Sequence, residues 1–521
     1  MRYFDDKVFF HDSKKYIFAV LFFAAAGIFF INQYAFLDFP NSADEYSYQI
    51  MARTLSVGKL SVPSPPLKEF FDFIHVINDG KFYSKYSPGW PFFLMFGFLI
   101  GIPMVVNLIF SLSSIVVVFL IAKELFSERI AKSAILLMAV SPYFLFNSAT
   151  YYPQPSVLFS LSFFTYCYIK GSASKKPLYF LVQGILLGII FNIRQFDAVI
   201  IGSCFFVYEV AEVLIKRKTV REAIRNMALV AGPVLILSVI FFYYNYIQSG
   251  DPLLTPFTKY EPKDRLGFNT GYLNSFSWAI GYNIFRRLFM LNLWIPFCLF
   301  ILPAAFILSR KEERAKVILL LLIPVSYLFG YFFFAMPEWN NYGPRYIYPA
   351  SFAVFILTAF GLERISSWRN PLKFAVIPVI LVSITLTVVN VFLMHEKTIE
   401  RTAVYSEVEY LTITNAIVFL VPTDYGCSGD MPCVDLTRNG ISFDAPVLYV
   451  HYQGAEKNLS LMKHFPKRDY YYWYCDGVHV EKVPVLDFMR AKNEHCLLVK
   501  IDPVRVEETV KEYRLKQKER N

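Results

Sequence analysis

Residues 16–37 read YIFAVLFFAAAGIFFINQYAFL, and the polar segment NSADEY follows at 41–46. The apolar stretch has the length of roughly 20 residues that an α-helix needs to cross the core of a bilayer. It is too long for the core of a signal peptide, and no small-residue cleavage site follows it, so we predict a retained helix. The first predicted element is therefore a membrane span, and an acidic pair, Asp44 and Glu45, lies just beyond it.

The same composition extends over most of the 521 residues. Apolar residues make up 55% of the chain, which includes 54 Phe and 35 Tyr, and charged residues only 18%, a balance typical of a protein solvated by lipid. None of the predicted spans contains Lys or Arg, as expected for helices that satisfy their own backbone in hydrocarbon. We predict an all-α polytopic membrane protein with about eleven transmembrane helices. After the first run, the apolar runs lie at 103–122, 133–149, 155–169, 178–193, 197–215, 227–247, 290–309, 317–335, 346–362 and 374–394.

The basic residues predict the orientation of these helices. If the N-terminus is cytosolic, the inner segments carry more Lys and Arg than the longer outer segments, and Lys216-Arg217-Lys218 is the densest cluster. This asymmetry fits the positive-inside rule and indicates a cytosolic N-terminus. The net charge of +10 then follows from topology, and no nucleic-acid partner is needed to explain it.

Residues 395–521 differ in composition from the membrane region at 1–394, and the predicted orientation places them outside the cell. Alternating runs predict a small extracytoplasmic α/β domain, with strands at 416–421, 446–452, 470–474 and 496–501 and a helix near 458–464. An even number of cysteines outside the cytoplasm predicts one or two disulfides, and reduced buried thiols are the alternative. The connectivity is open among Cys427, Cys433, Cys475 and Cys496.

Two outer loops, at 38–102 and 248–289, are long enough to be functional. In the first, Ser42 and Glu45 have the spacing of a capping box at the start of a helix that runs to about Val57. Asp44 is not needed for that box, and the helix macrodipole would keep it ionised, as a carboxylate base requires. Asp44 and Glu45 are thus candidate catalytic residues, with dipole compensation and helix capping as the alternatives.

The first outer loop also contains candidate ligands for an anion. Residues 73–86 predict a β-hairpin around an Asn-Asp-Gly turn, and an apolar stretch of about eleven residues follows Ser87-Pro88-Gly89-Trp90-Pro91, which suits a helix lying at the membrane interface. Lys85 precedes this helix, where its ammonium could hold a lipid phosphate or simply reach the interface.

Arginines in the other outer segments extend this set. Arg345 lies at the mouth of the span at 346–362, where a guanidinium can bind phosphate oxygens bidentately. Arg194 and Asp197 are three residues apart, a spacing at which they can pair with each other. We interpret Arg286 and Arg287 as interfacial anchors.

The order of these motifs resembles that of the GT-C glycosyltransferases. The first span is followed by Asp-Glu, then by Tyr-Ser-Lys-Tyr-Ser-Pro-Gly-Trp-Pro, Asp-Arg-Leu-Gly-Phe and Gly-Pro-Arg-Tyr. Over about residues 10–395 the chain is similar to prokaryotic relatives of the protein O-mannosyltransferases (glycosyltransferase family 39) and to the lipid A aminoarabinose transferases.

The resemblance implies a sugar donor carried on a polyprenyl phosphate and a glycan, lipid or protein acceptor. Its prokaryotic pattern implies a plasma (inner) membrane, with the endoplasmic reticulum as the alternative. The acidic residue of the family corresponds to Asp44, and its lysine that contacts the donor phosphate looks like Lys85. We add Arg345 and Arg265 as phosphate ligands. Tyrosines beside these motifs, Tyr83, Tyr86 and Tyr346, are the candidate substrate-binding residues.

The chain also departs from these families. Tyr46-Ser47 follows the acidic pair instead of the Val-His of eukaryotic O-mannosyltransferases, and no Trp-Trp-Asp signature of oligosaccharyltransferases occurs. A ligase or polymerase of lipid-linked glycans is the alternative enzyme, because it shares the polyprenyl leaving group. A secondary transporter is a further alternative, although such proteins carry ionisable groups within their spans.

The resemblance and the residues together predict a one-step reaction. Asp44 would take the proton of an acceptor hydroxyl as that oxygen attacks the anomeric carbon, with inversion. No cofactor is required in this mechanism, because the cationic side chains neutralise a monophosphate. A divalent metal is not excluded, but the sequence contains no clear cluster of ligands.

Overall fold

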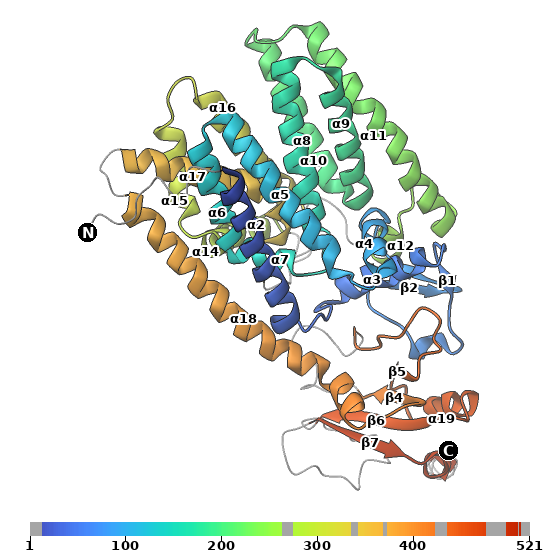
Figure 1. Cartoon of the computed structure of the whole chain (residues 1–521). Coiled ribbons are helices and arrows are strands. Elements are labelled where there is room, and N and C mark those ends of the chain that lie inside the picture. Colours follow the sequence, from blue (N-terminus) through green and yellow to red (C-terminus); the bar gives the residue numbers. More distant parts are fainter. Residues whose placement is uncertain are drawn as a thin grey trace. The chain divides into compact units, whose positions relative to one another are not determined.

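The computed structural model describes residues 13–262, 275–334, 342–367, 372–421, 435–475, 496–508 and 510–511. The chain forms two compact units (Figure 1). The first combines Met1–Asp38 with Ser87–Met394, and the second combines Phe39–Tyr86 with His395–Asn521. Residues 39–86 of the first outer loop therefore fold together with residues from the far end of the chain.

The first unit is helical, and every predicted apolar run lies on helices. Within the described residues, six helices are long and apolar enough to cross a membrane, or up to eight if two bent pairs are each one span. The prediction of about eleven spans therefore holds for the positions of the helices, while their number as full spans stays a prediction. In chain order the elements are α2 (Ser13–Phe30), η1 (Ile31–Ala35), α4 (Gly89–Leu99), α5 (Met104–Leu125), α6 (Glu128–Val140), α7 (Pro142–Ser148), α8 (Gln154–Ser174), α9 (Pro177–Ile193), α10 (Gln195–Leu214), α11 (Val220–Ser249), α12 (Pro256–Tyr260), α13 (Phe276–Trp278), η4 (Ala279–Arg286), α14 (Arg287–Trp294), α15 (Cys298–Ile307), α16 (Arg314–Phe332), η5 (Arg345–Ala350), α17 (Ser351–Ser367) and α18 (Leu372–Tyr410).

Two glycines determine how closely α9 and α11 pack. A Cβ atom on Gly184 would lie 2.4 Å from the backbone oxygen of Val230, and one on Gly188 would lie 2.7 Å from the Leu237 side chain. The four-residue spacing puts both glycines on one face of α9, the small-residue pattern that lets membrane helices approach closely. Both helices belong to the group α8–α11, drawn in green in Figure 1.

An irregular segment lies between α7 and α8, next to the bent pair α6 and α7, which meet at 60°. Backbone that is not helical can lie at membrane depth only if side chains satisfy its polar groups. Here three buried side chains donate hydrogen bonds to four consecutive carbonyls. The pairs are Asn32 Nδ2 with Ala149 O (3.0 Å), Asn107 Nδ2 with Thr150 O (2.6 Å) and Tyr152 O (2.9 Å), and Trp90 Nε1 with Tyr151 O (2.8 Å).

The second unit opens with the helix and the hairpin predicted in the first outer loop. Helix α3 (Ala43–Ser56) is followed by β1 (Val62–Pro63), η2 (Lys68–Phe70), β2 (Val76–Asp79) and β3 (Lys81–Ser84). Strands β2 and β3 pair antiparallel with Asp79 opposite Lys81, and Gly80 turns the chain with φ of +72°. Glycine adopts this left-handed conformation without steric cost, so the Asn-Asp-Gly signal identified the turn.

A four-stranded sheet forms the rest of the second unit, with strand order β5-β4-β6-β7. The strands β4, β5 and β6 are parallel, β7 is antiparallel to β6, and all four lie where the sequence predicts strands. The predicted helix near 458–464 is α19. The bounds are β4 (Ala416–Leu420), β5 (Val447–His451), α19 (Ala455–His464), β6 (Asp469–Cys475) and β7 (Cys496–Ile501).

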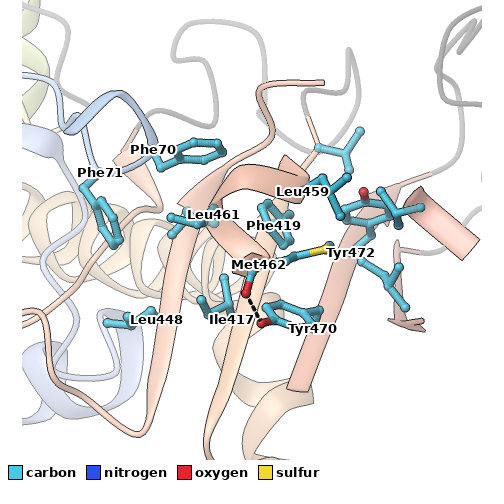
Figure 2. Close-up of a cluster of buried hydrophobic side chains, with 14 of the residues drawn as sticks. Phe70, Phe71, Ile417, Phe419, Leu448, Leu459, Leu461, Met462, Tyr470 and Tyr472 are labelled. Atoms are coloured by element: carbon cyan, nitrogen blue, oxygen red, sulfur yellow. Dashed lines mark hydrogen bonds between the residues drawn. The ribbon is translucent and has the colours of Figure 1, made fainter. Parts of the chain in front are cut away.

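The first outer loop packs against this sheet. Phe70 and Phe71 are fully buried in a cluster with apolar residues of β4, β5, β6 and α19 (Figure 2). In the same cluster the Tyr470 hydroxyl donates to the Met462 carbonyl at 2.7 Å. His451 adds a polar contact, with its Nε2 2.7 Å from the Asp72 backbone oxygen, and burial lowers its pKa below the usual value. Segments about 380 residues apart thus share one core.

Cys496, at the start of β7, is disulfide-bonded, in line with the predicted oxidised cysteines. Cys427 and Cys433 lie outside the described residues, so the connectivity is still open.

Candidate active site

Asp44 lies in the first turn of α3, where the Ser42 side chain caps the helix. The Ser42 hydroxyl accepts from the Glu45 backbone N–H at 3.1 Å and donates to the Glu45 carboxylate at 3.3 Å. The half of the predicted capping box in which Ser42 accepts from the Glu45 backbone is therefore present, and Glu45 is buried at 1% exposure. Asp44 is left to make other contacts at the positive end of the helix dipole.

Two side chains from the hairpin meet the Asp44 carboxylate. The Tyr86 hydroxyl donates to Asp44 Oδ1, and His75 Nε2 lies 3.3 Å from the same oxygen. Asp44 and His75 keep 14% and 17% of their side-chain surface exposed. The sequence predicted the acid and the tyrosine, but it assigned no role to His75.

A backbone network holds these contacts in place. The His75 carbonyl accepts from the Ser47 hydroxyl at 2.7 Å and from the Lys85 backbone N–H at 3.0 Å. Ser47 and Ser84 share a hydrogen bond of 2.8 Å between their hydroxyls, and Ser84 accepts from the Tyr86 N–H at 3.1 Å. Helix α3, His75 and the end of β3 are thereby tied together.

The structure places Lys85 and the two loop tyrosines next to this network. Lys85 is 5% exposed and its Nζ lies 5.4 Å from the centre of the Tyr86 ring. Tyr86 in turn packs against Tyr48, with 4.4 Å between ring centres. Tyr83 is buried in β3, and burial raises its pKa to about 12, so its hydroxyl is protonated at neutral pH. Asp44 and Lys85 thus both lie next to Tyr86, Asp44 at its hydroxyl and Lys85 over its ring.

In the first unit, Arg345 and Tyr346 belong to a second cluster of candidate residues. The Tyr346 ring stacks on Tyr331 at 4.8 Å between centres. Three guanidinium carbons lie near the Tyr346 ring, at 5.4 Å for Arg194, 5.4 Å for Arg287 and 5.6 Å for Arg345. We call these three side chains the arginine cluster.

The members of the arginine cluster differ in their partners. Arg194 pairs with Asp197 at 3.1 Å between Nε and Oδ2, as its spacing predicted. Arg287 is 1% exposed and donates to the Tyr331 carbonyl at 2.8 Å, so the interpretation of Arg287 as an interfacial anchor was wrong. The Arg345 guanidinium also lies 4.7 Å from the centre of the Tyr152 ring. The sequence predicted only Arg345 at this place, and the structure adds Arg194 and Arg287.

Comparison with solved structures identifies the fold. ArnT from Cupriavidus metallidurans in the apo state aligns with 94% of this chain and 98% of its own, with a TM-score of 0.62 and 13% identity. ArnT bound to undecaprenyl phosphate aligns with 93% of this chain and 97% of its own, with a TM-score of 0.59 and 12% identity. The fold is that of ArnT. The resemblance to the GT-C glycosyltransferases that the motif order predicted is thus confirmed at the level of fold.

The other comparisons cover less of this chain or of the matched protein than the comparison with ArnT does. The family model described as dolichyl-phosphate-mannose-protein mannosyltransferase matches residues 90–244. An oligosaccharyltransferase from Archaeoglobus fulgidus in the apo form aligns with 89% of this chain and 70% of its own, with a TM-score of 0.49 and 12% identity. No curated protein sequence matches the chain.

Two predictions about the site of this ArnT-like chain are not tested by the described residues. Arg265 lies outside them. In the part of the chain that the structure describes, no group of three or more His, Cys, Asp or Glu side chains could hold a metal ion. Independence from a metal therefore stays a prediction.

Proposed function

We propose that this chain is an integral-membrane glycosyltransferase that moves a sugar from a polyprenyl-phosphate donor to an acceptor hydroxyl on the outer face of the membrane, with inversion. The acceptor belongs to a glycan, a lipid or a protein. The fold of ArnT, which binds undecaprenyl phosphate, supports the donor class. The observation that carries the proposal is the Asp44 carboxylate, partly exposed and held by Tyr86 and His75.

Asp44 acts as the general base. It takes the proton of the acceptor hydroxyl while that oxygen forms a bond to the anomeric carbon, and the bond from this carbon to the phosphate oxygen breaks on the opposite face. A retaining double displacement would use a carboxylate as a nucleophile, whereas this single displacement uses it only as a base. Glu45, the second member of the acidic pair, stabilises the helical turn that presents Asp44 through its contacts with Ser42.

Cationic side chains bind the donor phosphate, and the candidates for this role are Lys85, Arg345 and Arg265. The phosphate gains negative charge as the sugar leaves, so cations contribute most in the transition state. Of the other arginines of the cluster, Arg287 adds positive charge near Arg345, whereas Arg194 is paired with Asp197. Tyr83 and Tyr86 in the second unit and Tyr346 in the first are the proposed substrate-binding residues, and no metal is needed to neutralise a monophosphate.

The test is an assay of the full chain in lipid nanodiscs with radiolabelled polyprenyl-phosphate sugars and acceptor extract, run with and without a chelator. We expect transfer of the label and release of polyprenyl phosphate. Asp44→Asn cannot accept the proton, so we expect its rate to fall ~10²–10⁴-fold, the usual contribution of a general base. Protein yield and the unfolding midpoint are expected to stay at the values of the unmodified chain.

Asp79→Asn is the matched control. Asp79 lies in the same unit, and its exposed ion pair with Lys68 at 3.0 Å contributes little to stability. We expect unchanged transfer for this variant. Unchanged turnover in Asp44→Asn would contradict the assignment of the base, and transfer only from diphosphate-linked glycans would indicate a ligase instead.

A further inference from the structure

We infer that His75 is a positioning residue for the base, and that it orients Asp44 and favours its ionised form. The inference rests on the proposed function and deepens it, because it concerns the same carboxylate. Three observations carry it: the backbone conformation of His75, the hydrogen bonds to its carbonyl, and the place of its imidazole.

The backbone of His75 is left-handed, with φ of +68°. Residues other than glycine adopt this conformation uncommonly, although histidine tolerates it better than most. It lies just before β2, so the turn into the hairpin sets the direction in which the imidazole leaves the chain. Such backbone conformations persist only where the surrounding structure determines them.

Two hydrogen-bond donors from different segments bind the carbonyl of this turn. The Ser47 hydroxyl comes from α3, one helical turn beyond Asp44, and the Lys85 N–H comes from the residue after β3. Both bonds end on the His75 carbonyl, so one peptide group sets the spacing between the helix that carries the acid and the segment that carries the lysine. Because these bonds use only the backbone of His75, they remain when its side chain is changed.

The imidazole then meets the acid. His75 Nε2 lies 3.3 Å from Asp44 Oδ1, the oxygen that also accepts from Tyr86, and the His75 and Tyr86 rings meet edge to face at 5.9 Å between centres. Asp44 and Tyr86 are thus titratable groups beside the imidazole, and the Lys85 ammonium lies over the Tyr86 ring. An Nε2–H group that donates to a carboxylate favours the charged form and lowers its pKa, both in the protonated imidazole and in the neutral tautomer with its proton on Nε2.

A change at His75 should therefore move the pH dependence of the reaction. His75→Asn tolerates the left-handed backbone, but its shorter side chain reaches only about as far as Nδ1 and loses the contact with Oδ1. The pKa of Asp44 then rises, and the acidic limb of the kcat/KM profile moves to higher pH. We expect kcat at neutral pH to fall about tenfold, the equivalent of ~1.4 kcal/mol, with the donor KM unchanged. His75→Gln places an N–H near the original Nε2 and should recover part of both effects.

The experiment measures pH–rate profiles of the full chain in nanodiscs for both His75 variants, with Asp44→Asn alone and combined with His75→Asn. His464→Asn at the exposed end of α19 is the matched control and should leave the profile unchanged. Because His75 acts through Asp44, its substitution should cause little further loss in the Asp44→Asn background. An acidic limb that does not move, or an equal loss in both backgrounds, would overturn the inference. Full activity of Asp44→Asn would instead contradict the proposed function.

Discussion

Asn107 shows how a single side chain supports a region that carries candidate site residues. Its amide nitrogen donates to two buried carbonyls, those of Thr150 and Tyr152. The Tyr152 ring lies under the guanidinium of Arg345, so this amide holds the backbone that carries one partner of a proposed phosphate ligand. A buried carbonyl without a donor costs about 1–3 kcal/mol.

Asn107→Leu keeps the size of the side chain and removes the donor. We expect the free energy of unfolding in detergent, measured by chemical denaturation, to fall by about 1–3 kcal/mol. The lower end of this range is expected, because hydrogen bonds within membranes have a small net value. Asn390→Leu is the control, because Asn390 donates at 2.8 Å only to the carbonyl of Leu386 on its own helix, which already has its helical partner. Equal losses in the two variants would contradict the role given to Asn107.

Local signals predicted part of the site. A capping pattern identified the turn that holds Asp44, and an Asn-Asp-Gly turn identified the hairpin that carries Tyr86. His75 was missed because its role depends on a left-handed backbone and on a carbonyl shared between two segments, neither of which any residue pattern encodes. The burial of Arg287 was missed for a related reason, since it depends on packing against Tyr331, 44 residues away.

At the level of elements, α9 and α11 can pack closely because Gly184 and Gly188 have no side chains at the contact. The backbone oxygen of Val230 lies only 2.4 Å from where a Cβ of Gly184 would be, and a backbone oxygen can move away only if the helix moves. The apolar runs at 178–193 and 227–247 predicted both helices, because an apolar run of that length can be recognised from the sequence alone. The runs could not predict which helices pair or which runs are full spans, since bent pairs and short helices have the same composition.

Gly184→Ala should force α9 and α11 apart. Alanine favours an isolated helix by up to ~1 kcal/mol over glycine, so a loss of stability must come from the contact. We expect the free energy of unfolding to fall by ~1–3 kcal/mol, the usual cost of overpacking. Gly232→Ala on α11 is the matched control, because nothing lies within 4 Å of its added Cβ, and it should be neutral or stabilising. If Gly184→Ala were as stable as Gly232→Ala, close packing through this glycine would be refuted.

For the molecule as a whole, the two compact units do not follow the order of the chain, because each combines two segments that are separated in the sequence. Residues 39–86 follow the first span directly, yet they share a core with residues that follow the last helix of the first unit. Sequence patterns could not reveal this, because Phe70 and Phe71 lie in a stretch without a clear period, and their partners come more than 340 residues later. Segments that share a core must lie on the same side of the membrane, so the predicted orientation places Asp44 and the sheet outside together.

This orientation can be measured with single cysteines and a maleimide that does not cross membranes. Lys59→Cys, after α3, is expected to react in intact cells, and Lys311→Cys, in a predicted inner segment, only after the membrane is opened; both positions are exposed. The unmodified chain, which has seven cysteines, is labelled in parallel as the control, and the labelling of each variant is measured above it. Protection of Lys59→Cys in intact cells, with labelling of Lys311→Cys there, would place the Asp44 carboxylate on the cytosolic side. An outward-facing donor head group could then not reach the base, and the proposed reaction would fail for a reason independent of any active-site variant.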